Sequence, residues 1–140
     1  MSECGIQLHD LPNSAEAAAI QQGIKEHNAP FRTSAWRELT VFSRGGNGTV
    51  MAGLNGYTDW DWLFVKLLWV GKADRGKGLG ARLLAAAEAE ARDRGCHSVW
   101  LDTFSFQARG FYERHGYGVF AELGDYPRGH SRIFLRKSLY

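Results

Sequence analysis

Residues 74–81, which read Asp-Arg-Gly-Lys-Gly-Leu-Gly-Ala, have the composition of a phosphate-binding turn. Glycines alternate at positions 76, 78 and 80, so the backbone can approach a bound group with no Cβ in the way. The turn follows an apolar run, residues 62–70, and precedes a strongly helical segment. It therefore lies at a helix N-terminus, where free N–H groups and the helix dipole favour an anion. Arg75 and Lys77 add positive charge, and together these residues predict a site for a phosphorylated ligand.

The same letters fit three phosphate-binding patterns to different degrees. Read as a P-loop, the stretch places Gly78 where Ser or Thr should hold magnesium, so that pattern lacks its metal ligand. Read as a dinucleotide fingerprint, it spells G-x-G-x-x-A from Gly76 to Ala81, with Asp102 about twenty residues further on. A third pattern, R-x-x-G-x-G, begins at Arg75.

Length and composition narrow these choices. The 140 residues suffice for a single domain, residues 1–140, but not for a full dinucleotide domain with a separate substrate domain. A net charge of +2 with dispersed basic residues argues against a nucleic-acid partner. Cys4 and Cys96 are isolated, without metal-ligand spacing, so we expect no metal site. Because Lys66 interrupts the apolar run and nothing resembles a signal peptide, we expect a cytoplasmic protein with no membrane partner.

The order of expected elements is a mixture of helices and strands. Before the glycine turn we expect a strand at 5–11, a helix at 15–27 capped by Ser14, strands at 36–43 and 49–57 joined by a glycine-rich hairpin turn, and a central strand at 62–70. After it we expect a helix at 79–94, a strand at 98–103, a short helix at 108–115, and closing strands at 118–123 and 131–137. Hairpins on both sides of the turn imply a mixed, mainly antiparallel sheet rather than a doubly wound one.

The glycine turn at residues 75–80 and a second motif at residues 105–117 resemble two motifs of the GNAT superfamily of N-acetyltransferases. The R-x-x-G-x-G pattern is similar to that family's pyrophosphate loop for acetyl-coenzyme A. After the following strand, the family commonly shows Asn-x-x-Ala-x-x-x-Tyr running into a Gly-aromatic pair. Here that stretch reads Ser105-Phe-Gln-Ala108-Arg-Gly-Phe-Tyr112-Glu-Arg-His-Gly116-Tyr117, with Ser105 in place of the Asn. The element order also agrees, apart from the family's second helix, which we expect to be missing or vestigial at residues 28–35.

The resemblance implies a fold and an activity. The fold would be α/β (α+β), with a mixed, mainly antiparallel sheet of about seven strands, helices on both faces, and a splayed pair formed by the fourth and fifth strands. The activity would be direct transfer of an acetyl group from acetyl-coenzyme A, as cosubstrate, to a primary amine, without a metal ion. A small-molecule acceptor is expected because the short N-terminal half leaves little surface for a long peptide groove. A homodimer is a further expectation, since many relatives pair.

The resemblance also assigns roles by position. The Leu68 N–H would polarise the acetyl carbonyl, and Val70 would bond the pantetheine arm. Tyr112 matches the tyrosine that protonates the departing thiolate. Further contacts to the cofactor are expected from Arg75, Gly76, Lys77, Gly78, Leu79, Gly80, Ser105 and the same Tyr112.

The general base is not at its usual place. Phe64 occupies the position that aligns with the glutamate of some family members, and the nearby Lys66 is a cation. The acidic candidates are Asp59, Asp61, Asp102, Glu122 and Asp125. Of these, Asp102 is expected near the splayed strands, so we assign it a catalytic role. The loop that carries Asp125, Tyr126 and His130 is expected to bind the substrate, and His130 brings to it an imidazole, the side chain most often used for acid–base work near neutrality.

Two other functions stay open from the sequence. A module or regulator that binds an acyl-coenzyme A without turnover would fit the missing base, whereas Tyr112 argues for an enzyme. A dinucleotide-dependent reductase would fit Asp102 but is disfavoured by chain length and strand order.

Overall fold

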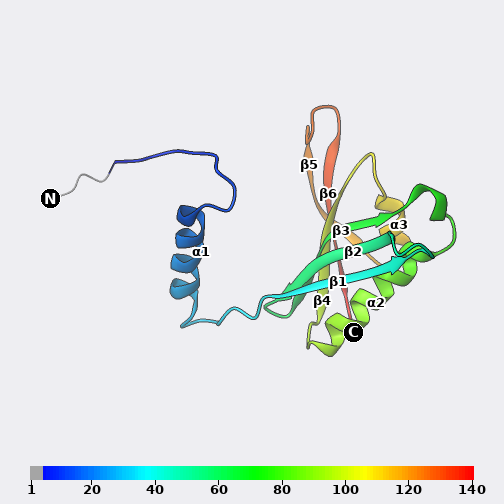
Figure 1. The fold of residues 1–140 in the computed structure, drawn as a ribbon, viewed down its shortest axis with the longest axis horizontal. Coiled ribbons are helices and arrows are strands. Elements are labelled where there is room, and N and C mark those ends of the chain that lie inside the picture. The colour runs from blue at the N-terminus through cyan, green and yellow to red at the C-terminus, as the bar shows by residue number, and fades with distance from the viewer. Residues whose placement is uncertain (1–4) are drawn as a thin grey trace. The chain divides into compact units, whose positions relative to one another are not determined.

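The computed structural model describes residues 5–140, in two compact units that meet between Ser34 and Ala35. In the first unit, helix α1 (Ala15–Asn28) begins after Ser14, whose Oγ accepts a hydrogen bond of 3.1 Å from the N–H of Ala17. This side-chain cap satisfies one of the N–H groups that a helix start leaves unpaired, and it confirms the predicted helix (Figure 1).

The strand predicted at residues 5–11 is absent from the structure. Residues 12–34 form no second strand that could pair with this segment, and a lone strand leaves its N–H and C=O groups without ladder partners. The prediction of a strand at residues 5–11, which rested on the local sequence pattern alone, is therefore wrong. Residues 29–35 contain no helix, as expected from the sequence.

The second unit is built on a single six-stranded sheet in the order β1-β2-β3-β4-β6-β5 (Figure 1). All neighbouring strands are antiparallel except β3 and β4, which are parallel. The mixed, mainly antiparallel sheet is confirmed, with six strands rather than about seven. The strands are β1 (Arg37–Arg44), β2 (Val50–Asp59), β3 (Trp62–Val70), β4 (Ser98–Phe104), β5 (Gly118–Gly124) and β6 (Ser131–Ser138).

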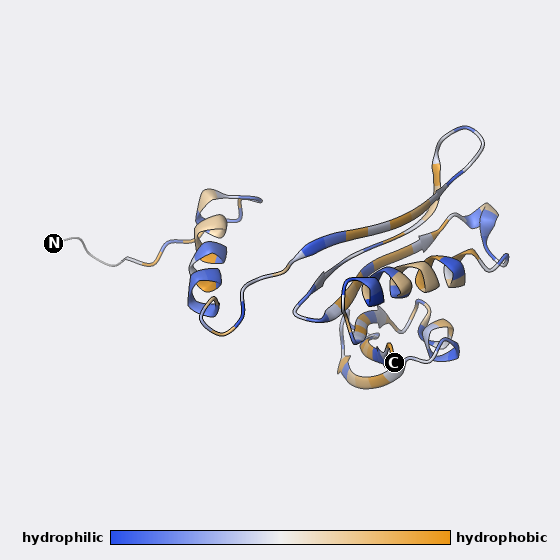
Figure 2. Ribbon diagram, turned by 90° about the horizontal axis from the view of Figure 1, so that it is seen from below, coloured by the Kyte–Doolittle hydropathy of each residue, from blue (hydrophilic) through white to orange (hydrophobic). Residues whose placement is uncertain are grey.

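Two helices of the second unit cover one face of the sheet. Figure 2 shows α2 (Leu79–Asp93) lying along the strands, and it packs against β1, β2 and β3. Its buried face includes Leu83 and Leu84, each contributing roughly 2 kcal/mol by leaving water. The short α3 (Arg109–Arg114) lies beside the start of α2. None of the helices among residues 5–140 is long and apolar enough to cross a membrane.

The parallel pair β3–β4 comes apart in the middle of the sheet. Its paired residues run from Trp62 opposite Ser98 to Val65 opposite Leu101. At the same level, β3 carries a bulge, because Leu67 and Val65 pair with consecutive residues of β2 and leave the intervening residue unpaired. Gly56 is needed there, since a Cβ on it would overlap the carbonyl oxygen of Phe64. The splayed pair expected from the sequence is therefore the β3–β4 pair.

Candidate active site

The half of β3 beyond the bulge turns backbone groups toward the gap left by β4. The N–H of Gly71 donates a hydrogen bond of 2.8 Å to the carbonyl of Met51 on β2. Because alternate residues of a strand direct their N–H and C=O groups to opposite neighbours, Leu68 and Val70 direct theirs away from β2. The Val70 carbonyl accepts a bond of 2.9 Å from Arg75 Nε, which agrees with that direction. The Leu68 N–H thus faces the gap.

The glycine turn leads from this strand end into α2. Gly76 and Gly78 have positive φ, +77° and +76°, a conformation that glycine adopts at little cost. An added Cβ on either would meet no described atom within 4 Å, so the space above both is open. Gly78 is the N-cap of α2 and offers no side chain to the first N–H groups. The exposed Lys77 and Arg75 flank a helix start that can receive an anion.

Tyr112 lies on α3, where neighbouring rings pack against its own ring and its hydroxyl makes no hydrogen bond to the described residues. The residue is 7% exposed, and its ring meets those of Phe111 and Tyr117 edge-on, with centroids 5.2 and 5.8 Å away. No other described residue forms a hydrogen bond with the hydroxyl, which is not fully buried. Burial, and secondarily the negative charge of Asp102, raises the pKa of Tyr112 to about 12. The phenol therefore carries its proton at neutral pH.

A buried network lies behind Tyr112. The hydroxyl of Tyr117 donates a hydrogen bond of 2.7 Å to Glu88, and the Lys137 ammonium donates one of 2.8 Å to the other oxygen of the same carboxylate. Burial, followed by the Glu88 hydrogen bond, raises the pKa of Tyr117 above its usual value. These contacts tie α2 and β6 to the ring on which Tyr112 packs.

Arg132 on β6 joins Asp102 to the β5–β6 loop. Its Nε donates a hydrogen bond of 2.8 Å to Asp102 Oδ1, and a second guanidinium nitrogen donates one of 3.0 Å to the Tyr126 hydroxyl. The guanidinium also lies 5.1 to 5.6 Å from the ring centroids of Phe104, Tyr126 and Phe134. Sequence reasoning missed Arg132, although opposite charges on neighbouring antiparallel strands were a signal that could have found it.

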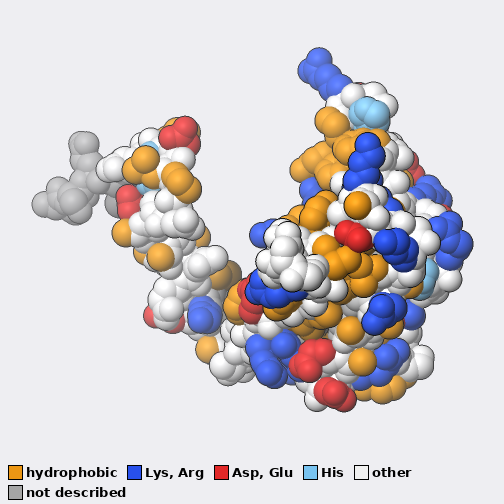
Figure 3. Space-filling model, turned by 45° about the vertical axis from the view of Figure 1, so that its right-hand side comes forward, with side chains coloured by type: hydrophobic (Ala, Val, Ile, Leu, Met, Phe, Trp, Pro, Cys, Tyr) orange, Lys and Arg blue, Asp and Glu red, His pale blue; other side chains and the backbone are white. Residues whose placement is uncertain are grey.

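Three other residues expected at the site, His130, Asp125 and Ser105, make their contacts in or beside the β5–β6 hairpin loop. His130 packs its ring edge-on against Phe106, with centroids 5.0 Å apart, near the tip of the hairpin. Figure 3 shows hydrophobic side chains gathered below this tip, with Lys and Arg side chains around them. Asp125 accepts a hydrogen bond of 3.2 Å from the Gly129 N–H and so supports the loop. Ser105 Oγ accepts one of 3.0 Å from the N–H of Ser131.

The remaining acidic candidates lie elsewhere. Asp59 ends β2, and Asp61 lies in the turn before β3, at the opposite end of β3 from the glycine turn. Glu122 is on β5, an edge strand of the sheet on the far side of β6 from β4. Of the five carboxylates, Asp102 alone is adjacent to the point where β3 and β4 separate.

The sequence profile of the Acetyltransferase (GNAT) family matches residues 8–117, which include the glycine turn, the splayed strands and Tyr112. The chain belongs to the GNAT family of acetyltransferases. The resemblance inferred from the two motifs is thereby confirmed.

Named acetyltransferases are among the relatives of this GNAT chain. It is 46% identical over 107 residues to a blasticidin-S acetyltransferase of Streptomyces morookaense, covering 74% of this chain and 79% of the relative. It is 38% identical over 131 residues to an acetyltransferase of Agrobacterium fabrum, covering 93% and 96%. A crystal structure of a putative acetyltransferase from Agrobacterium tumefaciens matches with a TM-score of 0.89 at 37% identity, over 96% of this chain and 98% of that one. The protein is therefore an acyltransferase.

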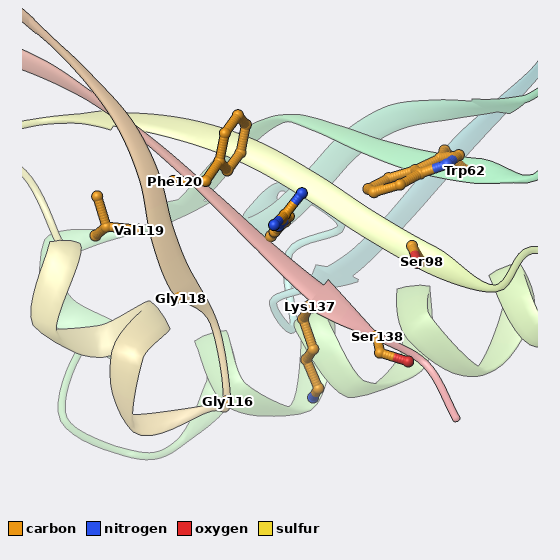
Figure 4. A pocket seen from close by; sticks show the side chains of 9 residues that line it. Trp62, Ser98, Gly116, Gly118, Val119, Phe120, Lys137 and Ser138 are labelled. Atoms are coloured by element: carbon orange, nitrogen blue, oxygen red, sulfur yellow. The ribbon is translucent and has the colours of Figure 1, made fainter.

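A hollow of about 520 Å³ lies at the opposite ends of the strands from the glycine turn of this GNAT fold. In Figure 4 the rings of Trp62 and Phe120 lie on one side of the strands, while Lys137 points to the other, where it reaches Glu88. Trp62 opens β3, whereas the glycine turn follows its last residue, so the hollow is roughly 25 Å from the turn at about 3.3 Å per residue. It is too distant to be part of the same site. Among residues 5–140, no three His, Cys, Asp or Glu side chains are grouped as a metal site would need.

Proposed function

We propose that this GNAT protein transfers an acetyl group from acetyl-coenzyme A to the primary amine of a small molecule, directly, in a ternary complex. One observation carries the proposal: the strand edge opened by the β3–β4 gap leads straight into the uncapped glycine start of α2. The gap offers backbone groups to an extended arm. The helix start offers N–H groups and positive potential to a pyrophosphate.

The residues fit the two ends of such a ligand. The amides of the turn from Arg75 to Gly80 would receive the pyrophosphate, and the Val70 backbone would bond the pantetheine arm. The Leu68 N–H, which faces the gap, would donate to the acetyl oxygen as negative charge develops on it. A backbone donor in this position requires no Ser-His-Asp set.

The chemistry needs two proton transfers. The amine nitrogen forms a bond to the thioester carbonyl carbon, and the carbon–sulfur bond breaks with its electron pair on sulfur. Tyr112, whose pKa of about 12 keeps it protonated, would give its proton to that thiolate. Asp102 would take the proton that the amine loses, through a water molecule. One of its oxygens is held by Arg132, which leaves the second for that role.

The acceptor class rests on the relatives and on the loop. The Streptomyces relative is named for blasticidin S, a small-molecule antibiotic. Tyr126 and His130 are on the hairpin that Arg132 fastens to Asp102, so a small acceptor beside the gap would meet them. These residues would bind the substrate rather than perform the chemistry.

The test combines binding with turnover. Calorimetry with acetyl-coenzyme A should show one site per chain, and nicotinamide cofactors should show none. A thiol-release assay with blasticidin S and a panel of small primary amines should then give coenzyme A and the N-acetylated amine in equal amounts. Binding without thiol release from any amine would contradict the transfer step, and an absence of binding would contradict the cofactor assignment.

A further inference from the structure

Tyr117 and Tyr112 are joined by a short return of the backbone after α3. The carbonyl oxygen of Tyr112 accepts hydrogen bonds of 2.9 Å from the His115 N–H and 3.1 Å from the Tyr117 N–H. Gly116 has a φ of +92° in this return, a conformation that glycine adopts at little cost. The two tyrosine rings then meet edge-on, one of the favoured arrangements of aromatic pairs. The place of the Tyr117 ring therefore limits how the Tyr112 ring can turn.

The far end of the Tyr117 side chain is anchored to a buried carboxylate. Its hydroxyl donates a hydrogen bond of 2.7 Å to Glu88 Oε2, and the Lys137 ammonium donates one of 2.8 Å to Glu88 Oε1. A carboxylate only accepts hydrogen bonds, and a buried one needs donors, which Glu88 has on both of its oxygens. Glu88 is on α2 and Lys137 is on β6, so two elements outside α3 hold the Tyr117 hydroxyl in place.

Lys137 holds the Tyr117 ring as well as the carboxylate. Its ammonium nitrogen lies 5.5 Å from the Tyr117 ring centroid, within the range of cation–π attraction. Its aliphatic part passes Gly116, where an added Cβ would lie 3.4 Å from Lys137 Cε. The glycine that permits the backbone return therefore also gives the lysine its path to Glu88. Tyr117 is thus fixed through its backbone, its ring and its hydroxyl.

Tyr112 has no such anchor at its own hydroxyl. No other described residue forms a hydrogen bond with it, so its orientation depends on the rings of Tyr117 and Phe111. Burial, and then the negative charge of Asp102, raises the pKa of Tyr112, so the phenol lies within electrostatic reach of the carboxylate beside the β3–β4 gap. A shift of 1 Å in a reacting group can cost about 10²-fold in rate. The residue that fixes the Tyr112 ring therefore matters for chemistry at the gap.

We propose that Tyr117 is a positioning residue for acetyl transfer: its ring, anchored by Glu88 and Lys137, holds the Tyr112 phenol in the orientation that protonates the departing thiolate. Tyr117 gives no proton itself, because its hydroxyl donates to Glu88. The inference rests on the proposed acetyl transfer for the role of Tyr112 as an acid. The orientation of the Tyr112 ring by Tyr117 can be measured without turnover.

The first test places Tyr117→Phe in two backgrounds. The variant keeps the ring but loses its bond to Glu88, which retains Lys137, so the protein should stay folded. In the wild type, kcat for thiol release should fall about tenfold, with acetyl-coenzyme A affinity within about twofold. In the Tyr112→Phe protein, which has no phenol to orient, the same substitution should change kcat by less than about twofold. A fall by the same factor in both backgrounds, or no fall in either, would overturn the proposal.

Thr58→Val is the matched control. The buried Thr58 hydroxyl on β2 accepts a hydrogen bond of 3.1 Å from Arg94, which follows the last residue of α2, at the opposite end of that helix from the glycine turn. Both substitutions delete one buried hydroxyl that bonds a charged side chain, so both should lower the melting temperature. Thr58→Val should leave kcat unchanged. An equal loss of kcat in Thr58→Val and Tyr117→Phe would contradict positioning through Tyr112.

The second readout needs no turnover. Nuclear magnetic resonance of protein with isotope-labelled tyrosine measures how fast the Tyr112 ring flips about its axis. Tyr117→Phe should raise that rate at least about tenfold, whereas Thr58→Val should not change it. An unchanged flip rate in Tyr117→Phe would overturn the proposal, whatever happens to kcat.

The two readouts separate this inference from the proposed function. A flip rate that depends on Tyr117, together with wild-type turnover in Tyr112→Phe, would retain the positioning of the ring and reject Tyr112 as the acid. The same flip rate without thiol release from any amine would retain the positioning and reject acetyl transfer.

Discussion

The ring of Tyr117 meets the ring of Tyr112 edge-on at 5.8 Å, and the Tyr117 hydroxyl is itself fixed by Glu88. The two tyrosines therefore differ in what their hydroxyls do. The Tyr117 hydroxyl donates a hydrogen bond to the buried carboxylate of Glu88. The Tyr112 hydroxyl has no hydrogen-bond partner among residues 5–140. Packing therefore orients the ring of Tyr112 without engaging its hydroxyl.

Tyr112→Phe should remove that proton with little change in packing, because the ring contacts stay and no hydrogen bond is lost. If Tyr112 protonates the leaving thiolate, turnover should fall by roughly 10² to 10⁴, the range for a positioned acid. The affinity for acetyl-coenzyme A, measured by calorimetry, should stay within a few-fold. Near-normal turnover combined with a large loss of thermal stability would instead make Tyr112 a packing residue.

The stability of the protein should depend on Tyr112 at alkaline pH. The pKa of Tyr112 is about 12 in the folded chain and about 10 in an unfolded one. A raised pKa contributes stability that is complete below pH 10 and is lost as the pH rises from about 10 to 12. At pH 11 the wild type should have lost about 1 kcal/mol of unfolding free energy relative to Tyr112→Phe, compared with their difference at pH 8. Urea unfolding of both proteins at the two pH values measures this, and a difference that does not change with pH would contradict it.

The Glu88 network should matter more for stability than a surface pair on the same helix. Glu88→Ala leaves the Tyr117 hydroxyl and the Lys137 ammonium without their shared partner, which should cost about 2 to 3 kcal/mol. Glu90→Ala breaks a pair with Arg94 in which the glutamate side chain is 41% exposed, and should cost less than about 1 kcal/mol. Chemical unfolding of the two variants gives the comparison. Equal losses would show that the buried network contributes no more than the exposed pair.

Local patterns in the sequence predicted the elements that depend on local forces. The bounds predicted for β3 are the observed Trp62–Val70, because its apolar run is bounded by polar and glycine residues. The glycine turn was predicted from its alternating glycines between an apolar run and a helix. The positive φ of Gly76 and Gly78 was not part of that prediction. The strand at residues 5–11 failed because alternation of side chains cannot supply a partner strand. The functional roles assigned to individual residues stay predictions.

Contacts that depend on strand register could not be read from the sequence. Phe42, Gly53 and Trp69 become neighbours only when three strands pair in one alignment, and a shift of one residue would turn each to the other face. Arg132 likewise reaches Asp102 only through the pairing of β4 with β6, 30 positions apart in the chain. Such contacts follow from tertiary pairing rather than from any motif.

Asp102→Asn should test the proposed base. The amide keeps the shape of the carboxylate but cannot take a proton from the amine. Turnover should fall by about 10² to 10⁴, with acetyl-coenzyme A affinity retained. Glu122→Gln, on the edge strand β5, serves as the control and should leave turnover unchanged. Turnover that survives Asp102→Asn unchanged would assign the proton to another group.

The glycine turn offers a matched pair of variants. Gly78 and Gly95 both have positive φ, +76° and +86°, and both face open space, but they lie at opposite ends of α2. Asparagine tolerates this conformation better than other side chains, so Gly78→Asn and Gly95→Asn should have similar, small effects on thermal stability. Valine would instead combine backbone strain with any loss of binding.

Only the substitution at Gly78 places atoms where a pyrophosphate would rest on the helix start. Gly78→Asn should therefore weaken acetyl-coenzyme A binding by at least about tenfold, or 1.4 kcal/mol, while Gly95→Asn leaves it unchanged. Calorimetry on both variants, with circular dichroism to confirm folding, measures the difference. If the folded Gly78→Asn protein binds as tightly as Gly95→Asn, the pyrophosphate does not lie on this helix start, and the cofactor assignment of the turn must be abandoned.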